Sequence, residues 1–265
     1  MFHQRPKKSL GQHFLNSTDY ARAVADALAP DAANVVEVGP GRGMLTQFLV
    51  NRFDTLLLVE KDALLTHDLV ARWGHTEGVI IHEADFLSLD LQAFWGERAY
   101  SIVGNFPYNI SSQIVFKALD HRQRVLEIVG MFQLEMARRI VASPGTKDYG
   151  ILSVLVSSAY EGSLLFKVPP GAFSPPPKVM SAVIRLKRKP DYEPPCQFGS
   201  LRQIVRSAFG QRRKMLRNSL KGLLPDSTLR VESMFQKRPE QLTLEEFVDL
   251  ALQYERFRRP QGPGS

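Results

Sequence analysis

Apolar residues in the first half of the chain fall into short runs that alternate with stretches of helical spacing. The runs, rich in Val, Ile and Leu, predict buried strands over residues 34–38, 55–59, 78–82, 100–103 and 126–131. Apolar positions three and four residues apart predict helices over residues 44–52, 62–73, 110–119 and 133–141. Another helix is expected to start near Ser17 and to end before Pro30. This alternation indicates an open α/β sheet of the Rossmann-like kind.

The pattern changes in the second half of the chain. Further elements are expected as a helix over residues 149–159 and strands over residues 164–168 and 179–186. A polar segment with prolines follows at residues 187–195 and predicts a linker. We therefore expect a Rossmann-like domain with an N-terminal arm at residues 1–190 and a small all-α domain at residues 191–265. Helices of the second domain are expected over residues 200–210, 212–223, 227–236 and 243–255.

Glycine or polar residues stand where four of the predicted strands end. These residues are Gly39, Glu60, Asp85 and Asn105. The carboxyl ends of parallel strands meet at one edge of a sheet, where ligands bind in this fold class. The turn that starts at Gly39 lets the backbone approach a ligand, and Glu60, 21 residues further on, stands where an acidic residue binds ribose hydroxyls. A ribose-bearing cofactor is therefore predicted, while Asp85 fits an adenine contact and a helix N-cap equally well.

The segment Asn105-Phe106-Pro107-Tyr108 has the chemistry to grip a flat heterocycle that carries an amino group. The Asn105 carbonyl can accept from an exocyclic amine, and its NH2 group can donate to a ring nitrogen. Pro107 fixes the backbone, so that nearby carbonyls can accept from the same amine. Tyr108 offers a face on which a base can stack. A strand-to-loop turn with a buried aromatic is the alternative explanation.

Phe173 lies in a second candidate segment, a loop with five prolines at residues 169–178. Prolines make this loop stiff, so that Phe173 has a rigid support. It is expected to form a second wall against a flipped base, opposite Tyr108. A hydrophobic plug under the loop explains Phe173 equally well.

The positive charge of the chain is concentrated in its last quarter. The net charge is +7, and residues 200–265 contribute 13 Lys/Arg against 7 Asp/Glu, whereas residues 1–199 contribute 21 against 20. Such asymmetry suggests a polyanion-binding appendage beside a nearly neutral body. The expected phosphate contacts are Arg212, Arg213, Lys214, Arg217 and Lys221. A solvated charged face is the alternative.

Other features narrow the class of protein. The single cysteine, Cys196, excludes an internal disulfide framework and indicates a reducing cytoplasm. The sequence shows no Cys/His cluster with zinc spacing, no apolar run long enough to span a membrane and no apolar stretch of a signal peptide. We therefore expect a cytoplasmic protein without a metal.

Taken together, the motifs resemble those of the ribosomal RNA adenine dimethylases, in particular the bacterial enzymes that act on 16S rRNA. The matching stretches begin at Gly11, Val36, Val59, Asn105, Phe173 and Phe209, and read GQHFL, VEVGPG, VEKD, NFPYN, FSPPPKV and FGQRRK. They span nearly the whole chain in the order of the family. No single stretch is decisive, but the set is highly specific.

The resemblance implies a Rossmann-like methyltransferase domain with S-adenosylmethionine as the methyl donor. It implies two adjacent adenines in the 3′-terminal hairpin loop of 16S rRNA as the substrate, methylated during assembly of the 30S subunit. Nothing in the sequence demands a dimer, so a monomer is expected. Carried over motif by motif, the cofactor contacts are His13, Leu15, Gly39, Glu60, Asp85 and Asn105. Position 13 is more often Asn in this family, so the side chain of His13 is a departure from its pattern.

Two rival functions share these motifs. The first is another nucleic-acid adenine methylase, acting on 23S rRNA or DNA. These enzymes grip the adenine with the same Asn-Pro-Tyr motif, so the motif does not distinguish among them. The second is a non-catalytic RNA-binding assembly or transcription factor that kept the fold. The intact series Gly39, Glu60, Asp85 and Asn105 favours an enzyme.

Overall fold

The computed structural model describes residues 12–190, 193–231 and 233–258. Most of the expected N-terminal arm, residues 1–11, lies outside the described residues. The chain forms two compact units. The first comprises Met1–Ala137 and Gly162–Arg188, and the second comprises Arg138–Glu161 and Lys189–Ser265.

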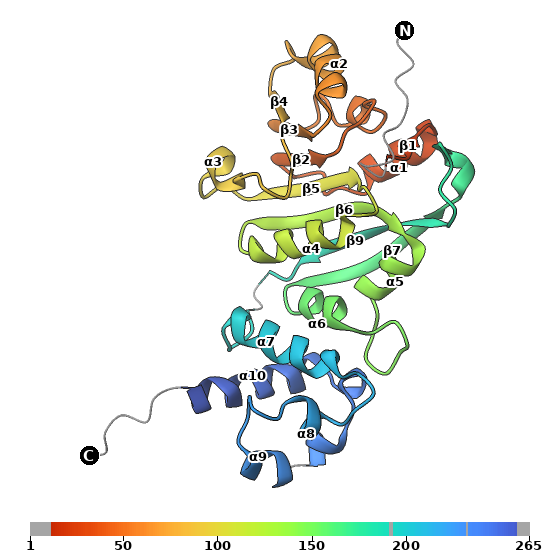
Figure 1. Ribbon diagram of the computed structural model, residues 1–265. Coiled ribbons are helices and arrows are strands. Elements are labelled where there is room, and N and C mark those ends of the chain that lie inside the picture. The colour runs from red at the N-terminus through yellow and green to blue at the C-terminus, as the bar shows by residue number, and fades with distance from the viewer. Residues whose placement is uncertain (1–11, 191–192, 232, 259–265) are drawn as a thin grey trace. The chain divides into compact units, whose positions relative to one another are not determined.

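A seven-stranded sheet forms the first unit, in the order β4-β3-β2-β5-β6-β9-β7 (Figure 1). The strands are β2 (Asn34–Val38), β3 (Thr55–Glu60), β4 (Val79–Glu83), β5 (Tyr100–Asn105), β6 (Val125–Gln133), β7 (Tyr160–Val168) and β9 (Ser181–Arg188). Strands β4 to β6 pair in parallel, and β9 joins β6 antiparallel. All five predicted strands of the first half are confirmed. Because their residues are apolar on both faces, they suit a sheet that helices cover on both sides.

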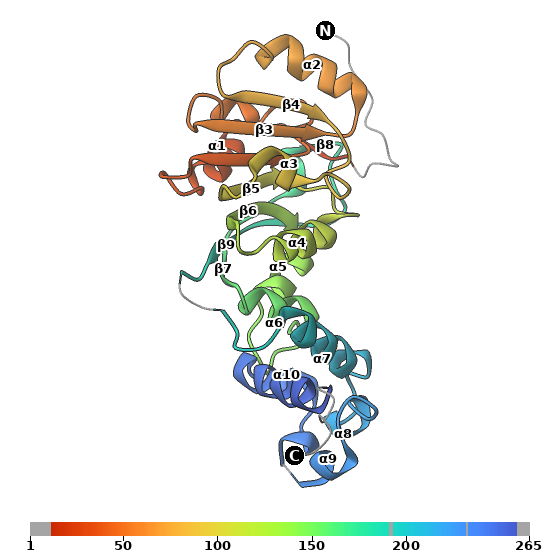
Figure 2. The same ribbon diagram turned by 90° about the vertical axis from the view of Figure 1, so that its left-hand side faces the viewer.

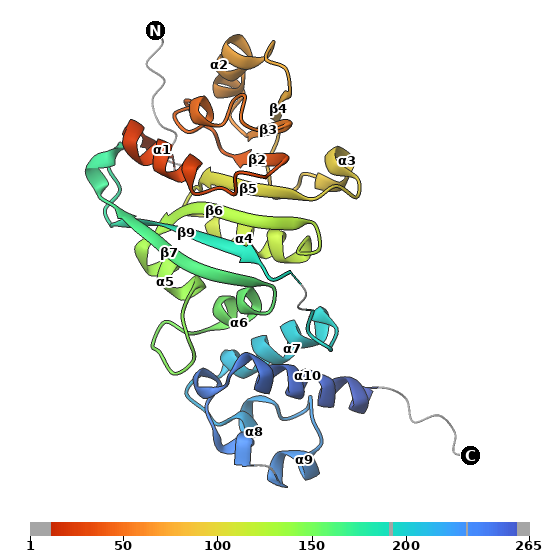
Figure 3. The same cartoon turned by 180° about the vertical axis from the view of Figure 1, so that it is seen from behind.

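Helices lie on both faces of this sheet. They are α1 (Thr18–Asp26), α2 (Ala63–Trp73), α3 (Leu91–Trp95) and α4 (Ser111–Asp120). Helix α5 (Leu134–Ile140) begins in the first unit and ends in the second. Helices α1 and α4 lie on opposite faces, as Figures 1 and 3 show together, and α2 lies along β3 and β4 (Figure 2). The Ser17 hydroxyl accepts from Tyr20 N at 3.5 Å, which confirms the expected start of the first helix.

The prediction of a helix over residues 44–52 is wrong. Only Thr46–Phe48 forms a short 3₁₀-helix, η2, between turns. Leu45 and Leu49 stand four positions apart, and both are buried, as they would be on one face of a helix. The turns that the segment forms bury both residues equally well. Asn51 closes the segment with φ of 63°, a conformation that no helix interior contains.

Two short strands join distant parts of the first unit. β1 (Phe14–Leu15) pairs antiparallel with β8 (Phe173–Ser174), which follows the 3₁₀-helix η3 (Pro170–Ala172). Asn16 N also donates to Ala172 O at 2.9 Å. The pairing ties the chain just before α1 to the proline-rich loop.

The second unit is helical. It contains α6 (Ile151–Ser157), α7 (Phe198–Gly210), α8 (Leu216–Ser219), α9 (Asp226–Val231), η4 (Ser233–Gln236), η5 (Pro239–Gln241) and α10 (Leu244–Arg258). Helix α7 packs against α6 and α10, and Phe209 lies against Tyr149 and Phe247.

Two expectations for this region need correction. Residues 138–161, placed in the first domain by sequence, belong to the second unit because α6 packs on α7. The helix expected over residues 212–223 shrinks to α8, because residues 211–215 form a turn. That turn is held by Arg212, whose guanidinium donates to Lys147 O at 2.7 Å.

Candidate active site

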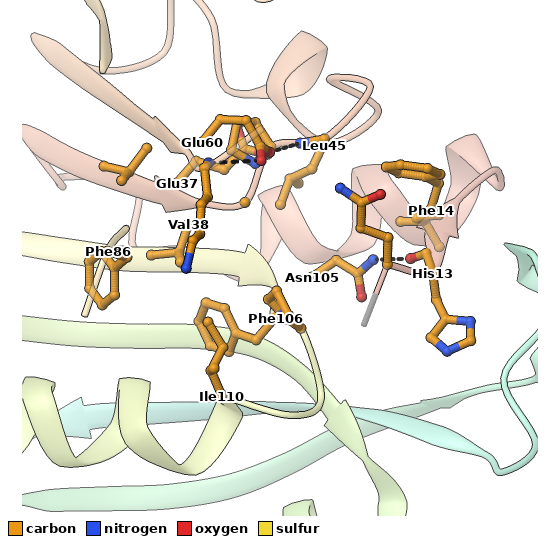
Figure 4. A pocket seen from close by; sticks show the side chains of 18 of the residues that line it. His13, Phe14, Glu37, Val38, Leu45, Glu60, Phe86, Asn105, Phe106 and Ile110 are labelled. Atoms are coloured by element: carbon orange, nitrogen blue, oxygen red, sulfur yellow. Dashed lines mark hydrogen bonds between the residues drawn. The ribbon is translucent and has the colours of Figure 1, made fainter. Parts of the chain in front are cut away.

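A pocket opens at the carboxyl ends of β2, β3 and β5 and beside the loop that follows β4 (Figure 4). Its walls include all of the expected cofactor contacts: His13, Leu15, Gly39, Glu60, Asp85 and Asn105. Apolar side chains, among them Phe86 and Leu45, form much of the remaining surface. The structure therefore brings the predicted series of strand-end residues together.

The glycine-rich turn after β2 forms one wall of the pocket. Gly39 N donates to Val59 O at 2.9 Å, and Gly39 and Gly41 both have positive φ, of 66° and 57°. A side chain is strained in that conformation, and at Gly41 its Cβ would also stand 3.1 Å from the ring of Phe14. The backbone is therefore open at Gly39, where a Cβ would come no closer than 3.8 Å to Pro107, whereas the ring of Phe14 packs on Gly41.

Glu60, at the end of β3, is held by main-chain donors. Its Oε1 accepts from Lys61 N and Asp62 N, each at 2.9 Å, and its Oε2 accepts from Gly41 N at 3.0 Å. A carboxylate offers about four acceptor positions, so one remains for a hydroxyl in the pocket. Burial raises the pKa of Glu60 while these donors oppose the rise.

Glu37 is a second carboxyl in the wall, on the neighbouring strand β2. Its side chain is 1 % exposed, and Thr46 Oγ1 donates to its Oε2 at 2.7 Å. Burial raises its pKa to about 8, and the nearby Glu60 adds to the rise. Glu37 therefore carries a proton at neutral pH. No role for Glu37 is predicted from the sequence, although a lone acidic residue within an apolar strand is a signal of a buried carboxyl.

We expect this proton to make stability depend on pH. The unfolded chain releases it near the ordinary value of 4.5, whereas the folded protein holds it up to about pH 8. The contribution of Glu37 to the free energy of unfolding is thus fully present below pH 4.5 and falls as the pH rises to about 8. Urea denaturation at several pH values should give Glu37→Gln a slope that is more positive than the wild-type slope by at most about 1.4 kcal/mol per pH unit. Equal slopes would contradict the raised pKa.

Asp85 lies in the loop after β4. The helix N-cap considered for it is wrong, because residues 86–88 form a turn and α3 begins only at Leu91, capped by Asp90. The contact of Asp85 with an adenine stays a prediction.

Asp85 Oδ1 accepts from Leu87 N at 2.9 Å, and its Oδ2 accepts from Lys61 Nζ at 2.8 Å. The Lys61 bond is the main cause of the lowered pKa of Asp85, which is therefore ionised at neutral pH. Lys117 of α4 supports the same loop by donating to Leu87 O and Leu89 O.

Asn105 ends β5 with its amide oriented by a partner. Asn105 Nδ2 donates to His13 O at 2.8 Å, drawn as a dashed line in Figure 4. A carbonyl can only accept, so the NH2 group must face His13 and Oδ1 must face the other way. Nδ2 carries a second hydrogen, so the expected donation from this NH2 group to a ring nitrogen stays a prediction. Asn105 presents an acceptor.

Pro107 and Tyr108 follow in a tight turn. Pro107 O accepts from Ile110 N at 3.1 Å and keeps one lone pair for a ligand. The Tyr108 hydroxyl shares a 2.6 Å hydrogen bond with Ser181 Oγ, and its ring stacks on His13 with centroids 5.5 Å apart. Burial raises the pKa of Tyr108, so it stays a neutral phenol. Its ring is therefore fixed at both its edge and its face.

Phe106 anchors the same turn from below. Its ring is 1 % exposed and meets Phe132 edge to face, with centroids 5.2 Å apart. Gly104 of β5 and Gly130 of β6 pair with each other and leave the space that the ring fills. Sequence alone could not identify Gly130 as part of the site, because only the pairing of the two strands brings it under Phe106.

Phe173 does not line the pocket. Its side chain is 3 % exposed and belongs to the same hydrophobic core as Ala172 and Val168. In β8 it pairs with Leu15, which does line the pocket. The expectation of a second wall opposite Tyr108 is not met in this conformation, and the structure favours the alternative, a plug beneath the loop.

The expected phosphate contacts lie in the second unit and differ in their surroundings. Arg212 is partly buried and holds the carbonyls of Thr146 and Lys147. The other four, Arg213, Lys214, Arg217 and Lys221, are exposed. Arg212 thus has a structural task that the sequence did not reveal.

The described residues were also examined for features of a metal site and of a membrane-spanning helix, and they show neither. Within residues 12–190, 193–231 and 233–258, no group of three or more His, Cys, Asp or Glu is arranged to hold a metal ion. Among the helices of these same ranges, none combines the length and the apolar character needed to cross a membrane.

Comparisons with known proteins agree with this geometry. The model of the family described as ribosomal RNA adenine dimethylase matches residues 3–253. The chain is 46 % identical over 255 residues to ribosomal RNA small subunit methyltransferase A of Porphyromonas gingivalis, covering 95 % of this chain and 98 % of the relative. It is 44 % identical over 252 residues to the protein of the same name from Flavobacterium johnsoniae, covering 95 % and 96 %.

Solved structures show the same fold. A dimethyladenosine transferase from Plasmodium falciparum matches with a TM-score of 0.78 at 23 % identity, over 92 % of this chain and 98 % of that one. The 23S rRNA methyltransferase ErmE matches with a TM-score of 0.66 at 27 % identity, over 89 % and 99 %. Both the Rossmann-like methyltransferase fold and the helical C-terminal part are thereby confirmed. With its family model matched from end to end and its strand-end residues gathered in one pocket, the chain belongs to the ribosomal RNA adenine dimethylase family.

Proposed function

We propose that this enzyme transfers methyl groups from S-adenosylmethionine to N6 of two adjacent adenines in the 3′-terminal hairpin loop of 16S rRNA. The observation that carries the proposal is the orientation of Asn105, whose Oδ1 is left as an acceptor beside the pocket. The relatives named ribosomal RNA small subunit methyltransferase A support the small-subunit RNA as substrate. We further propose that it acts as a cytoplasmic monomer on immature 30S particles.

The residues of the pocket fit S-adenosylmethionine. Glu60 offers an acceptor position for a ribose hydroxyl, and Asp85 offers one for an adenine amine beside the buried ring of Phe86. The glycine backbone at Gly39 allows close approach of the ligand. When bound, this cofactor supplies an activated methyl group on a sulfonium.

The target adenine must be made a better nucleophile, because its N6 lone pair is delocalised into the ring. Asn105 Oδ1 and the Pro107 carbonyl can each accept one hydrogen of the amine, which favours tetrahedral geometry at N6 and aims its lone pair. The face of Tyr108 opposite His13 would hold the flipped base. No general base is required, since the proton can leave after the methyl group arrives.

Dimethylation adds a second demand on the same residues. After the first transfer the amine has one hydrogen left, so only one of the two acceptors can be used in the second round. Asn105 Oδ1 is fixed by the bond from its NH2 group to His13 O, whereas the Pro107 carbonyl still accepts from Ile110 N. When the contact with the base is lost, the Pro107 carbonyl therefore keeps a hydrogen-bond partner, and the Asn105 amide keeps its orientation through His13.

A methyl-transfer assay with three substrates tests the proposal. Labelled S-adenosylmethionine would be offered with 30S particles from a strain that lacks the modification, with 50S precursors and with duplex DNA. We expect label only in the 30S particles, as dimethyladenosine at two neighbouring positions. Label in 50S precursors would favour methylation of 23S rRNA, the activity in the name of ErmE, which shares the fold, and label in DNA alone would end the proposal.

We also propose that the exposed cations of the second unit bind the RNA backbone. Exchanging both Arg213 and Lys214 for Gln should weaken binding to 30S particles and lower the salt dependence of log K by about 1 to 2 units, because each phosphate contact releases counterions. Filter binding at several salt concentrations measures both. In the control variant, two exposed cations of the first unit, Arg22 and Lys167, are both exchanged for Gln. An equal loss in both variants would show a general charge effect.

A further inference from the structure

His13 makes three contacts with residues around the target-binding turn. Its main-chain oxygen accepts from Asn105 Nδ2 at 2.8 Å, and its ring stacks on Tyr108 at an interplanar angle of 28°. Its Nδ1 lies 2.8 Å from Pro175 O, where it donates. A single residue therefore touches both Asn105 and Tyr108, the two groups that would hold the base.

The position of His13 is set by elements other than the turn it contacts. Its main chain leads directly into β1, which pairs with β8, and the hydrogen bond to Pro175 O fixes the plane of the ring. Tyr108 is held at its other end by Ser181 Oγ. The ring of Tyr108 is thus held by Ser181 at its hydroxyl and by His13 on one face.

The side chain of His13 is turned away from the expected cofactor groups. In Figure 4 its ring points away from Glu60 and Glu37, while its carbonyl is joined to Asn105. Its Nδ1 is already used by Pro175 O. The contacts of the imidazole with Tyr108 and Pro175 O thus connect it to the base-binding side of the pocket.

We propose that His13 is a positioning residue, which aligns Asn105 and Tyr108 for the target amine and does not bind the methyl donor through its side chain. This inference rests on the proposed function and deepens it. Removal of the ring leaves the main-chain bond to Asn105 in place but frees the face of Tyr108. The loss should therefore appear in the rate of methyl transfer and not in the affinity for the donor.

Three variants test this role in the full-length protein. His13→Ala removes the ring, His13→Phe keeps an aromatic face for Tyr108, and His67→Ala is a matched control on the exposed side of α2. The dissociation constant of S-adenosylmethionine would be measured at equilibrium, and methyl transfer to 30S particles in a single turnover at saturating donor. Thermal denaturation would show that all variants are folded at the assay temperature.

We expect His13→Ala to transfer methyl groups about tenfold more slowly, with donor affinity changed less than about twofold. His13→Phe should recover most of the rate, and His67→Ala should match the wild type. Weaker donor binding at an unchanged rate would overturn the inference, as would equal losses in His13→Ala and His13→Phe. The role of His13 is judged from the rates and donor affinities of the variants relative to the wild type. If the proposed function is wrong, the wild type itself will not transfer methyl groups to 30S particles.

Discussion

Asn105→Ala is expected to lower the rate of methyl transfer by about 10²- to 10³-fold, the cost of removing one preorganised hydrogen-bonding group from an active site. The variant loses the Oδ1 acceptor for the adenine amine and also leaves His13 O without its donor. Equilibrium binding of the methyl donor should change much less, because Glu60 and Asp85 are untouched. Single-turnover transfer of labelled methyl groups to 30S particles measures the effect.

Asn34→Ala is the matched control for this experiment. Asn34 also donates from Nδ2 to a main-chain carbonyl, Ala99 O, at 2.9 Å, but it stands at the opposite end of β2 from the pocket. It should cost about 1 kcal/mol of stability and leave methyl transfer intact. If Asn105→Ala retained a rate close to that of Asn34→Ala, the acceptor role of Asn105 would be wrong.

Gly130→Ala should damage both stability and catalysis. The added Cβ would stand 2.2 Å from Phe106 Cε2 and 2.8 Å from Phe132 Cε2, and both rings are fully buried. Since neither ring has space to move, we expect the free energy of unfolding to fall by about 1–3 kcal/mol. Phe106 joins Asn105 to Pro107, so its displacement should also slow methyl transfer by about tenfold or more.

Urea denaturation and transfer assays well below the melting temperature separate the two effects of Gly130→Ala. Gly199→Ala, near the start of α7, is the control, because a Cβ there meets nothing within 4 Å. It should be neutral or slightly stabilising, since alanine loses less conformational entropy in a helix than glycine does. If Gly130→Ala were as stable and as active as the wild type, the rings of Phe106 and Phe132 would have to be able to move apart without cost, which would contradict this prediction.

Much of the sheet could be predicted because its strands bury both faces. Runs such as residues 34–38 and 55–59 consist mostly of Val and Leu, which is typical of short strands buried on both faces. The edge strand β4 is less buried and was still found from its β-branched residues. Helix α3 (Leu91–Trp95) was missed, because five residues are too few to show a helical period.

The candidate site was predictable as far as strand ends determine it. Gly39, Glu60, Asp85 and Asn105 meet at one edge because parallel strands place their carboxyl ends together. Contacts made between distant segments could not be predicted. The amide orientation of Asn105 depends on His13, and the burial of Phe173 depends on its pairing with Leu15.

The β1–β8 ribbon has a consequence for how the protein is made. His13 and Pro175 are 162 positions apart, and closing so long a loop costs about 2.5 kcal/mol more than closing one of about ten residues. The intervening sheet must be in place before this contact becomes favourable. During synthesis the chain therefore exposes an unfinished Asn105 turn for as long as translation has not passed Pro175. Because Ser181 of β9 also holds Tyr108, we expect the base-binding turn to be complete only after translation has passed both segments.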